Sequence, residues 1–403
     1  MDHGAFVEIR RGFPGAAAGP YLDVAARGLL HSATRAAIDA MLDQQSAGAL
    51  DKKAAFAKVE ETRALFAALI RATPDEIAFT RNVTDGIAAF AVSLPWRPGD
   101  NVVLCDALEH PANLFPWYGL RPKFGVEVNT VPQERGAVPL DRILAAIDER
   151  TRVVTLATVS FAPGFRAPVA ELARHCRERG VLIVVDAAQS IGVLETDVGA
   201  MQVDALAAST QKGLMALYGL GFLYVRQALA ETLAPAYLSR FGVDLGDGHE
   251  AASGDAASYR LAKGARRFDL GNYNYMAIAG VCESMRLLLE LGPRQVEHHV
   301  LGLARRFARR MEQIGLPVYG GASANDASHI VTIGANLGSE HDSTADTEMT
   351  ALYDHLTAHG VRLGIRRDLL RFSFGIYNDE SDVDRVVALC QAWLKTRPAL
   401  AAA

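Results

Sequence analysis

Two long apolar runs constrain the fold of this chain more than any other feature. Val153–Val159 and Val181–Val185 consist of Val, Ile, Leu, Ala and Thr, with no alternation of apolar and polar residues. Such runs are typical of strands buried on both faces, as in a parallel sheet that helices cover. A helical segment, Glu171–Arg179, is predicted between them. We therefore predict an α/β fold with a mainly parallel central sheet covered by helices.

The same alternation extends on both sides of these runs. Further strands are predicted at Asp75–Thr80, Asn101–Cys105, Val126–Val131, Ala205–Ser209 and Gly221–Val225. Helices are predicted at Thr84–Leu94, Pro111–Phe124, Leu140–Ile147 and Met276–Leu291. This order is typical of an open α/β sheet, in which ligands bind at the carboxyl ends of the strands.

Length and one helix breaker indicate two domains. The chain has 403 residues, and single cores seldom grow beyond roughly 250–300 residues. Gly292-Pro293 ends a helical pattern, so we predict a large domain over residues 31–291 and a small α+β domain over 292–403. Residues 1–30 are expected to pack with the small domain, and the amphipathic Ser32–Leu42 either joins them or caps the large domain. The small domain should contain strands at His329–Ile333, Val361–Ile365 and Leu370–Phe374, and helices at Ala345–His359 and from Asp382.

Composition disfavours several classes of function. The formal charge is −5, which gives no electrostatic reason to bind nucleic acid or an anionic membrane. The longest strongly apolar stretch, Val181–Ala188, is far too short to span a bilayer. The N-terminus shows no long apolar segment of the kind found in secretory signals. Four scattered cysteines form neither a metal pattern nor a disulfide framework, which favours a cytoplasmic protein: Cys105, Cys176, Cys282 and Cys390.

Familiar phosphate and metal motifs are missing from the sequence. Neither GxGxxG nor GxxxxGK[ST] occurs, which disfavours a nicotinamide-dependent oxidoreductase and a P-loop enzyme. His298-His299 and His249-Glu250 are adjacent pairs and no HExxH occurs, so no metal site is expected. Gly242–Gly264 is rich in Gly, Ala, Ser and Asp. We predict a loop there, either a tolerated surface insertion or an active-site lid.

Asp186 and Lys212 are the strongest candidates for chemistry. Asp186 ends the apolar strand VLIVVD, where it either caps a following helix or meets a cation. Lys212 follows a short strand and is flanked by Leu206 and Leu214, which is an unlikely surface. A lysine in an apolar site loses its proton easily and can form a Schiff base. An aspartate with such a lysine is the pair that pyridoxal phosphate needs: the lysine holds its aldehyde carbon and the acid keeps its ring nitrogen protonated.

With these motifs the chain resembles the class V aminotransferase family of fold-type I pyridoxal phosphate enzymes. That family includes cysteine desulfurases, isopenicillin N epimerase-like proteins and kynureninases. The resemblance extends from YLDVAARG at Tyr21 to YNDESDVDRVV ending at Val387, and its motifs occur in the family's order. It implies a fold-type I transferase with a large cofactor-binding domain and a small α+β domain, active as a homodimer on an amino acid.

The resemblance also assigns cofactor contacts. In FTRNVTDGI, Thr84 and the amide of Val83 or Thr84 would bind the cofactor phosphate at a helix start, where orphan N–H groups favour an anion. His110 in LEHPANLFPW would stack on the pyridine ring and could move a proton near the Schiff base. Gln189 in DAAQ would donate to the phenolic oxygen of the ring. Ser209 and Gln211 would reach the phosphate, Gln211 standing where many relatives have a histidine.

Two further residues complete the implied site. Asn272 in RRFDLGNYN occupies the place from which relatives send a polar side chain to the phosphate of the partner subunit. Arg371 in LLRFSFG matches the arginine that binds the α-carboxylate of the substrate, for which its planar fork suits a bidentate contact.

The chain departs from cysteine desulfurases in two places. Those enzymes carry a nucleophilic cysteine on a loop shortly before the carboxylate-binding arginine, but VRLGIRRDLL has no cysteine and little room for a loop. Phe161 stands where desulfurases have an asparagine near the substrate carboxylate. The spacing from Lys212 to Gly219 and Gly221 is closer to the isopenicillin N epimerase-like branch.

The expected chemistry passes through an external aldimine and a Cα carbanion, with Lys212 as the base. The shared residues do not select the outcome. We favour a lyase or epimerase-type reaction without a catalytic cysteine, with an aminotransferase as the main alternative. A kynureninase-like hydrolase and a non-catalytic cofactor-binding regulator are weaker alternatives. Retention of Asp186, Lys212 and Arg371 argues against the regulator.

Overall fold

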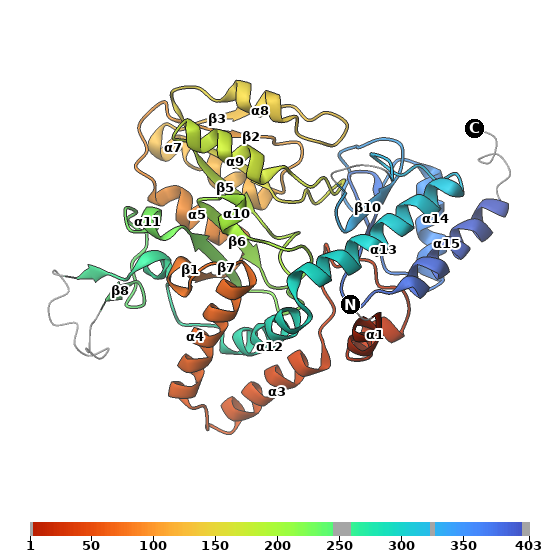
Figure 1. Ribbon diagram of the computed structural model, residues 1–403, viewed down its shortest axis with the longest axis horizontal. Helices are drawn as coiled ribbons and strands as arrows, with labels where there is room; N and C mark the ends of the chain where they lie inside the picture. Colours follow the sequence, from red (N-terminus) through yellow and green to blue (C-terminus); the bar gives the residue numbers. More distant parts are fainter. Residues whose placement is uncertain (1–2, 245–258, 323–326, 397–403) are drawn as a thin grey trace.

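The computed structural model describes residues 3–244, 259–322 and 327–396 and has the α/β architecture predicted (Figure 1). Seven strands form the central sheet in the order β1-β7-β6-β5-β4-β2-β3. Each strand predicted for this sheet forms within two residues of its expected ends: β1 (Ile77–Thr80), β2 (Asn101–Leu104), β3 (Glu127–Thr130), β4 (Thr151–Ala157), β5 (Leu182–Asp186), β6 (Ala205–Ser209) and β7 (Gly221–Val225).

The sheet is parallel in its centre and antiparallel at one edge. β3, β2, β4, β5 and β6 pair in parallel, and β7 pairs antiparallel with both β6 and β1. Side chains alternate between two cores, with Val154 and Val185 facing one and Val153 and Val184 facing the other. Because helices bury both faces, the central strands need apolar residues at every position.

Helices cover both faces of this sheet. One core receives α4 (Lys52–Leu69), α9 (Val169–Glu178) and α12 (Tyr275–Leu291), and the other receives α5 (Val83–Ser93). α3 (Ser32–Ser46) packs along α12. The two helices approach closely at Gly280, where a Cβ atom would lie only 2.9 Å from the Ile38 side chain. The amphipathic stretch therefore contacts a helix of the predicted large domain. The shorter helices around this sheet are α8 (Leu140–Ala146), α10 (Val198–Met201) and α11 (Gln227–Ala230).

The predicted helix Pro111–Phe124 is wrong as a single element. The structure has a 3-10 turn, η2 (Pro111–Asn113), followed by α6 (Phe115–Tyr118) and α7 (Arg121–Phe124). Each of the three pieces carries a proline in its first turn. Proline fits the first turn of a helix but has no N–H with which to continue one, so each proline begins a new short helical segment.

A second sheet forms from the C-terminal part of the chain. β10 (Ile330–Ile333), β12 (Leu369–Ser373) and β11 (Gly364–Arg366) pair antiparallel in that order. α13 (Pro293–Gln313) begins directly after Gly292 and extends in Figure 1 from α12 towards β10, α14 (Thr347–Ala358) and α15 (Glu380–Lys395). The boundary at Gly292 thus coincides with a junction of two long helices, and the division into domains remains a prediction.

The N-terminal segment lies against this second sheet. After α1 (His3–Arg11) and α2 (Pro14–Ala17), Tyr21 and Asp23 form bridges with Arg362 and Ser373. Ser373 N–H donates to the Leu22 carbonyl at 2.8 Å. The segment around Leu22 is therefore hydrogen-bonded to a strand from the C-terminal part of the chain.

Most of the predicted Gly242–Gly264 loop, including His249-Glu250, falls at residues 245–258, outside the described residues. On its flanks, β8 (Val243–Asp244) pairs with β9 (Arg260–Leu261), and a 3-10 turn, η4 (Gly264–Phe268), follows. Within the described part of the chain, no helix is long and apolar enough to cross a membrane.

Candidate active site

Asp186 is the last residue of β5, at the carboxyl end of the parallel sheet. Its neighbours in the ladder are Ala157 of β4 and Ala207 of β6, and it is only 5% exposed. Ala188 N–H donates to its Oδ1 at 2.8 Å. Burial raises the pKa of Asp186, and the positive charge of Lys212 opposes that change. The sheet therefore holds a carboxylate in an apolar setting, with Lys212 as a nearby cation.

Lys212 lies in the connection between β6 and β7. Burial lowers the pKa of its amine to about 8, and the charge of Asp186 offsets part of this effect. Among the described residues, its Nζ has no hydrogen-bond partner. The N-terminal segment fixes the turn: Gly28 N–H donates to the Gln211 carbonyl at 2.8 Å. A Cβ on Gly28 would lie 2.3 Å from the Lys212 carbonyl oxygen, so only glycine fits there.

Gln189 and Ser209 lie buried at the same edge of the sheet. Gln189 Nε2 donates to the Ala25 carbonyl at 3.2 Å, while its buried Oε1 has no partner among the described residues. Ser209 ends β6, and Gln211 is partly buried. Gln189 follows β5 and Ser209 ends β6, and these two strands pair in parallel.

Helix α5 begins where the phosphate contact was predicted. Asn82 caps the helix, its side chain accepting from Asp85 N–H at 2.9 Å. This cap does not use the amides of Val83 and Thr84, the first two residues of the helix. Val83 is buried and Thr84 is exposed. The first turn of α5 therefore offers backbone donors and one hydroxyl for an anion.

His110 begins the turn η2 and is exposed. Its Nδ1 accepts from Ala112 N–H at 3.1 Å, and its ring meets Phe161 edge to face with centroids 5.6 Å apart. Partial burial lowers the pKa of His110, and the charge of Lys212 lowers it further. The imidazole is therefore neutral near pH 7 and suited to stacking on an aromatic ring.

Arg371 lies in the middle of β12 and is 2% exposed. Its Nη1 donates to the Phe161 carbonyl at 3.1 Å and its Nη2 to Asp23 Oδ1 at 3.2 Å. Its Nε is buried without a partner among the described residues. Burial lowers the pKa of Arg371 to about 10, which still leaves it charged at neutral pH, and Asp23 opposes the shift. The sequence did not single out Asp23, although YLDVAARG displays it.

Asn272 is exposed. It lines a surface pocket of about 790 Å³ with Thr80 and Arg81, which immediately precede α5. Tyr237 and Leu270, which are exposed, line the same pocket. The pocket thus joins Asn272 to the region where the phosphate contact was predicted.

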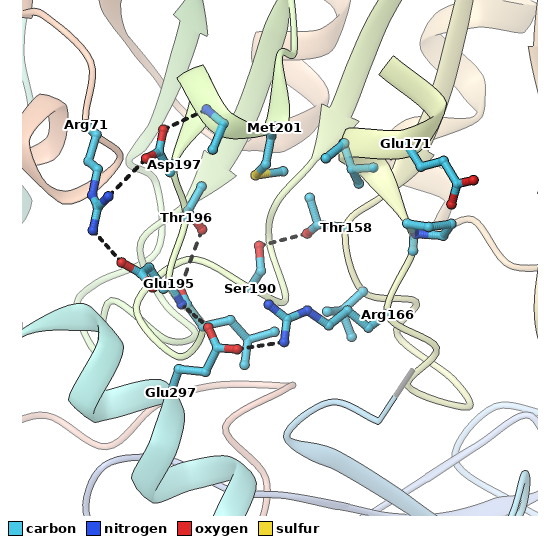
Figure 2. A pocket seen from close by; sticks show the side chains of 17 residues that line it. Arg71, Thr158, Arg166, Glu171, Ser190, Glu195, Thr196, Asp197, Met201 and Glu297 are labelled. Carbon is cyan, nitrogen blue, oxygen red and sulfur yellow. Dashed lines mark hydrogen bonds and ion pairs between the residues drawn. The ribbon is translucent and has the colours of Figure 1, made fainter. Parts of the chain in front are cut away.

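A second pocket, of about 620 Å³, adjoins the loop after Asp186 (Figure 2). Glu297 of α13 accepts from Arg166 Nη1 at 2.6 Å and from Glu195 N–H at 2.7 Å. Thr158 and Ser190 share a hydrogen bond of 2.7 Å. These contacts join α13 to two loops at the edge of the central sheet. Over the described residues, no group of three or more His, Cys, Asp or Glu side chains could hold a metal ion.

These residues fit pyridoxal phosphate. Lys212 supplies an amine of lowered pKa that has no partner in the described chain. Asp186 supplies a buried carboxylate with one oxygen engaged by Ala188 N–H. The buried Gln189 Oε1 and Arg371 Nε, which lack partners among the described residues, indicate polar positions that a bound molecule would complete.

Comparison with known proteins gives a consistent result. The family model "Aminotransferase class-V" matches residues 21–386. A probable cysteine desulfurase of Methanothermobacter thermautotrophicus is 34% identical over 265 residues, which cover 65% of this chain and 64% of that protein. The apo structure of a cysteine desulfurase from Thermococcus onnurineus NA1 superposes with a TM-score of 0.82 at 24% identity, covering 97% of this chain and 98% of the other. The cystine C–S lyase C-DES, solved with its product cysteine persulfide, superposes with a TM-score of 0.81 at 21% identity, covering 93% and 98%.

Proposed function

Since the chain belongs to the aminotransferase class-V family of pyridoxal-phosphate-dependent enzymes, we propose that it acts at the Cα of an amino acid and catalyses a lyase or epimerase-type reaction without a catalytic cysteine. The observation that carries this proposal is the pairing of Lys212, whose pKa is lowered to about 8, with the buried Asp186. An amine with that pKa is a competent base near neutral pH.

Each proposed role rests on the chain's own residues. When bound, pyridoxal phosphate supplies a ring that accepts electrons from the substrate Cα. Lys212 Nζ would hold the cofactor and, once released, would take the Cα proton. Asp186 would keep the ring nitrogen protonated through the oxygen that Ala188 N–H does not engage. Arg371 holds the α-carboxylate of the substrate and so orients the Cα bonds.

The remaining assigned residues hold the cofactor in place. His110 would stack on the ring, and Gln189 would bind its phenolic oxygen. The first turn of α5, with Val83 and Thr84, would hold the phosphate together with Ser209 and Gln211. The buried positions of Gln189 and Ser209 support these assignments.

The absence of a catalytic cysteine is supported by the hairpin before Arg371. Arg366 of β11 pairs with Leu369 of β12, so only Arg367 and Asp368 connect the two strands. Both connecting residues have positive φ, 56° and 65°, as in a tight two-residue turn. Such a turn leaves no loop to carry a nucleophile. All four cysteines of the chain are buried elsewhere.

We also propose a homodimer in which Asn272 reaches the phosphate of the partner subunit. The exposed Tyr237 and Leu270 beside Asn272 support an interface on this face. Mixing inactive Lys212→Ala chains with inactive Asn272→Ala chains should restore part of the activity, because subunit exchange creates one intact site per heterodimer. A fully active monomer in analytical ultracentrifugation would exclude the arrangement.

A screen of amino acids against the holoenzyme tests the reaction. A lyase releases pyruvate, ammonia or sulfide, and an epimerase interconverts enantiomers with solvent exchange of the Cα hydrogen. An aminotransferase, the main alternative, yields a keto acid and the aminated cofactor. A kynureninase-like hydrolase would cleave kynurenine. If no amino acid changes the visible spectrum of the cofactor, the proposed activity is wrong. The remaining hypothesis is then a non-catalytic cofactor-binding regulator.

A further inference from the structure

Glu109 is a buried acid to which none of the roles above is assigned. It precedes His110 and is only 5% exposed. Ala157 N–H donates to its Oε1 at 2.8 Å, and Asn113 Nδ2 donates to its Oε2 at 2.7 Å. Ala157 is the ladder partner of Asp186. The Glu109 side chain therefore connects the turn over residues 109–113 to the carboxyl ends of the central strands, where Asp186 lies.

Trp117 fixes the direction of these hydrogen bonds. An indole N–H can only donate, and Trp117 Nε1 donates to Asn113 Oδ1 at 3.1 Å. Thr155 Oγ1 donates to the same oxygen at 3.0 Å. Asn113 must therefore present its NH₂ group to Glu109. Since Ala157 N–H is also a donor, residue 109 has to supply two acceptors.

Only a carboxyl group meets this requirement. A glutamine at position 109 would place its NH₂ group against either Asn113 Nδ2 or Ala157 N–H. Burial raises the pKa of Glu109 to about 8, and the charge of Asp186 adds to the shift. In the protonated form the hydroxyl oxygen still accepts a hydrogen bond, so both protonation states keep two acceptors.

The same turn carries His110. Ala112 N–H donates to His110 Nδ1, and Asn113 N–H donates to the His110 carbonyl at 2.8 Å. Because Nδ1 is engaged within the turn, the orientation of the imidazole follows the orientation of the turn. A change at Glu109 would thus reach the ring of His110 without any direct contact between the two side chains.

We propose that Glu109 is a positioning residue that acts through His110: its two acceptor oxygens lock the 109–113 turn so that the imidazole keeps the orientation required to stack on pyridoxal phosphate. This inference rests on the proposed function, which assigns the stacking role to His110.

Reversing one hydrogen bond tests the proposal. Glu109→Gln sets two donors against each other, whereas Asn113→Asp places a second carboxyl group against Glu109, where the two acids can share one proton. In the double variant, the amide introduced at position 109 would donate its N–H to the carboxylate introduced at position 113, and the carbonyl oxygen of that amide would accept from Ala157 N–H. The new carboxylate would still accept from Trp117 and Thr155. The double variant therefore rebuilds the lock with its polarity reversed.

Two properties of the bound cofactor are measured: its dissociation constant and its induced circular dichroism. Glu109→Gln alone should bind pyridoxal phosphate about tenfold more weakly, which corresponds to about 1.4 kcal/mol, and should show an altered dichroism band. The double variant should return to within about threefold of the unaltered protein. A purely structural Glu109 would lower the melting temperature of the apoprotein and leave the dichroism of bound cofactor unchanged, which overturns the proposal.

His110→Ala distinguishes this inference from the proposed function. In that background, Glu109→Gln should cause no further loss of cofactor affinity, because effects transmitted through one residue are not additive. Equal losses with and without His110 would overturn the inference about Glu109. If His110→Ala alone leaves affinity and dichroism unchanged, the stacking role in the proposed function is wrong instead.

Discussion

The two halves of the candidate site are built in different ways. In the cofactor half, Asp186 ends β5 and Ser209 ends β6, and these strands are paired by a backbone ladder in the centre of the sheet. In the substrate half, Arg371 lies in the three-stranded sheet and is held by Asp23 and the Phe161 carbonyl. Asp23 and Arg371 are 348 positions apart in the sequence.

The two halves differ in whether existing hydrogen bonds have to be replaced when a substrate binds. Backbone ladders hold Asp186 and Ser209 before any ligand arrives, so these groups are preorganised. Arg371 instead already donates a hydrogen bond to Asp23. The carboxylate of a substrate therefore has to compete with Asp23 for the guanidinium group. We therefore expect changes in the cofactor half to reduce turnover, and changes in the substrate half to alter mainly substrate affinity.

Lys212→Ala should have the largest effect. It removes both the covalent anchor and the proposed base, so we expect turnover to fall about 10⁴-fold or more. Borohydride reduction followed by mass spectrometry should no longer trap the cofactor on the protein. Lys263→Ala is the matched control, because Lys263 is an exposed lysine paired with Asp75. Trapping of cofactor in the Lys212 variant at the level of the control would sink the assignment.

Asp186→Ala should have the next largest effect. The variant still binds the cofactor but no longer holds the proton on the ring nitrogen, and each pKa unit lost costs about 1.4 kcal/mol. We expect a loss of about three powers of ten in kcat. Asp204→Ala is the control, because Asp204 is also buried beside β6 but accepts from Ile183 N–H and Arg226. It should lower stability and leave the cofactor spectrum unchanged. A loss of only twofold for Asp186→Ala would mean that another group contacts the ring nitrogen.

The cofactor half was also the half that the sequence revealed more directly. Asp186 follows an unbroken apolar strand and Lys212 follows another, so local pattern and chemistry together predicted that they meet at one sheet edge. The ladder places Asp186 between Ala157 and Ala207 at the carboxyl end of the parallel strands. Arg371 was identified only through the family resemblance, because an arginine within a strand does not reveal its partner. Its contact with Asp23 depends on the packing of the N-terminal segment against β12, which no local pattern encodes.

Other features could not be predicted from the sequence, for physical reasons. The direction of β7 was not predicted, because a strand buried on both faces shows the same apolar run in either direction. α4 was not predicted, since many of its apolar positions are alanines and its hydrophobic stripe is weak. Glu109 was visible in LEHPANLFPW, but its importance comes from Ala157 and Trp117, which are distant or oriented only in the folded chain.

Asp23→Asn should have a smaller effect, confined to the substrate half. The amide keeps the shape and one acceptor for Arg371, but it removes the negative charge that competes with the substrate carboxylate. We expect KM for the active amino acid to fall about three- to tenfold, or about 0.7–1.4 kcal/mol, with kcat nearly unchanged. Asp342→Asn provides the comparison, because Asp342 is an exposed partner of Arg366 and should have little effect. A rise in KM would show that Asp23 supports substrate binding, and the contrast between the two halves would then be wrong.

Replacement of all four cysteines should have the smallest effect. A thiol nucleophile needs thiolate character and access, and neither is present here. Cys105, Cys176, Cys282 and Cys390 are all buried, and burial raises the pKa of Cys105 to about 11 and of Cys176 to about 12. Changing all four to Ala or Ser should keep activity within about tenfold, a cost near 1.4 kcal/mol on the barrier, with any loss arising from packing. If a single cysteine change abolishes turnover while the cofactor stays bound and the melting temperature is unchanged, the chain uses a thiol after all. The reaction would then have to be reconsidered as desulfuration with a relocated nucleophile.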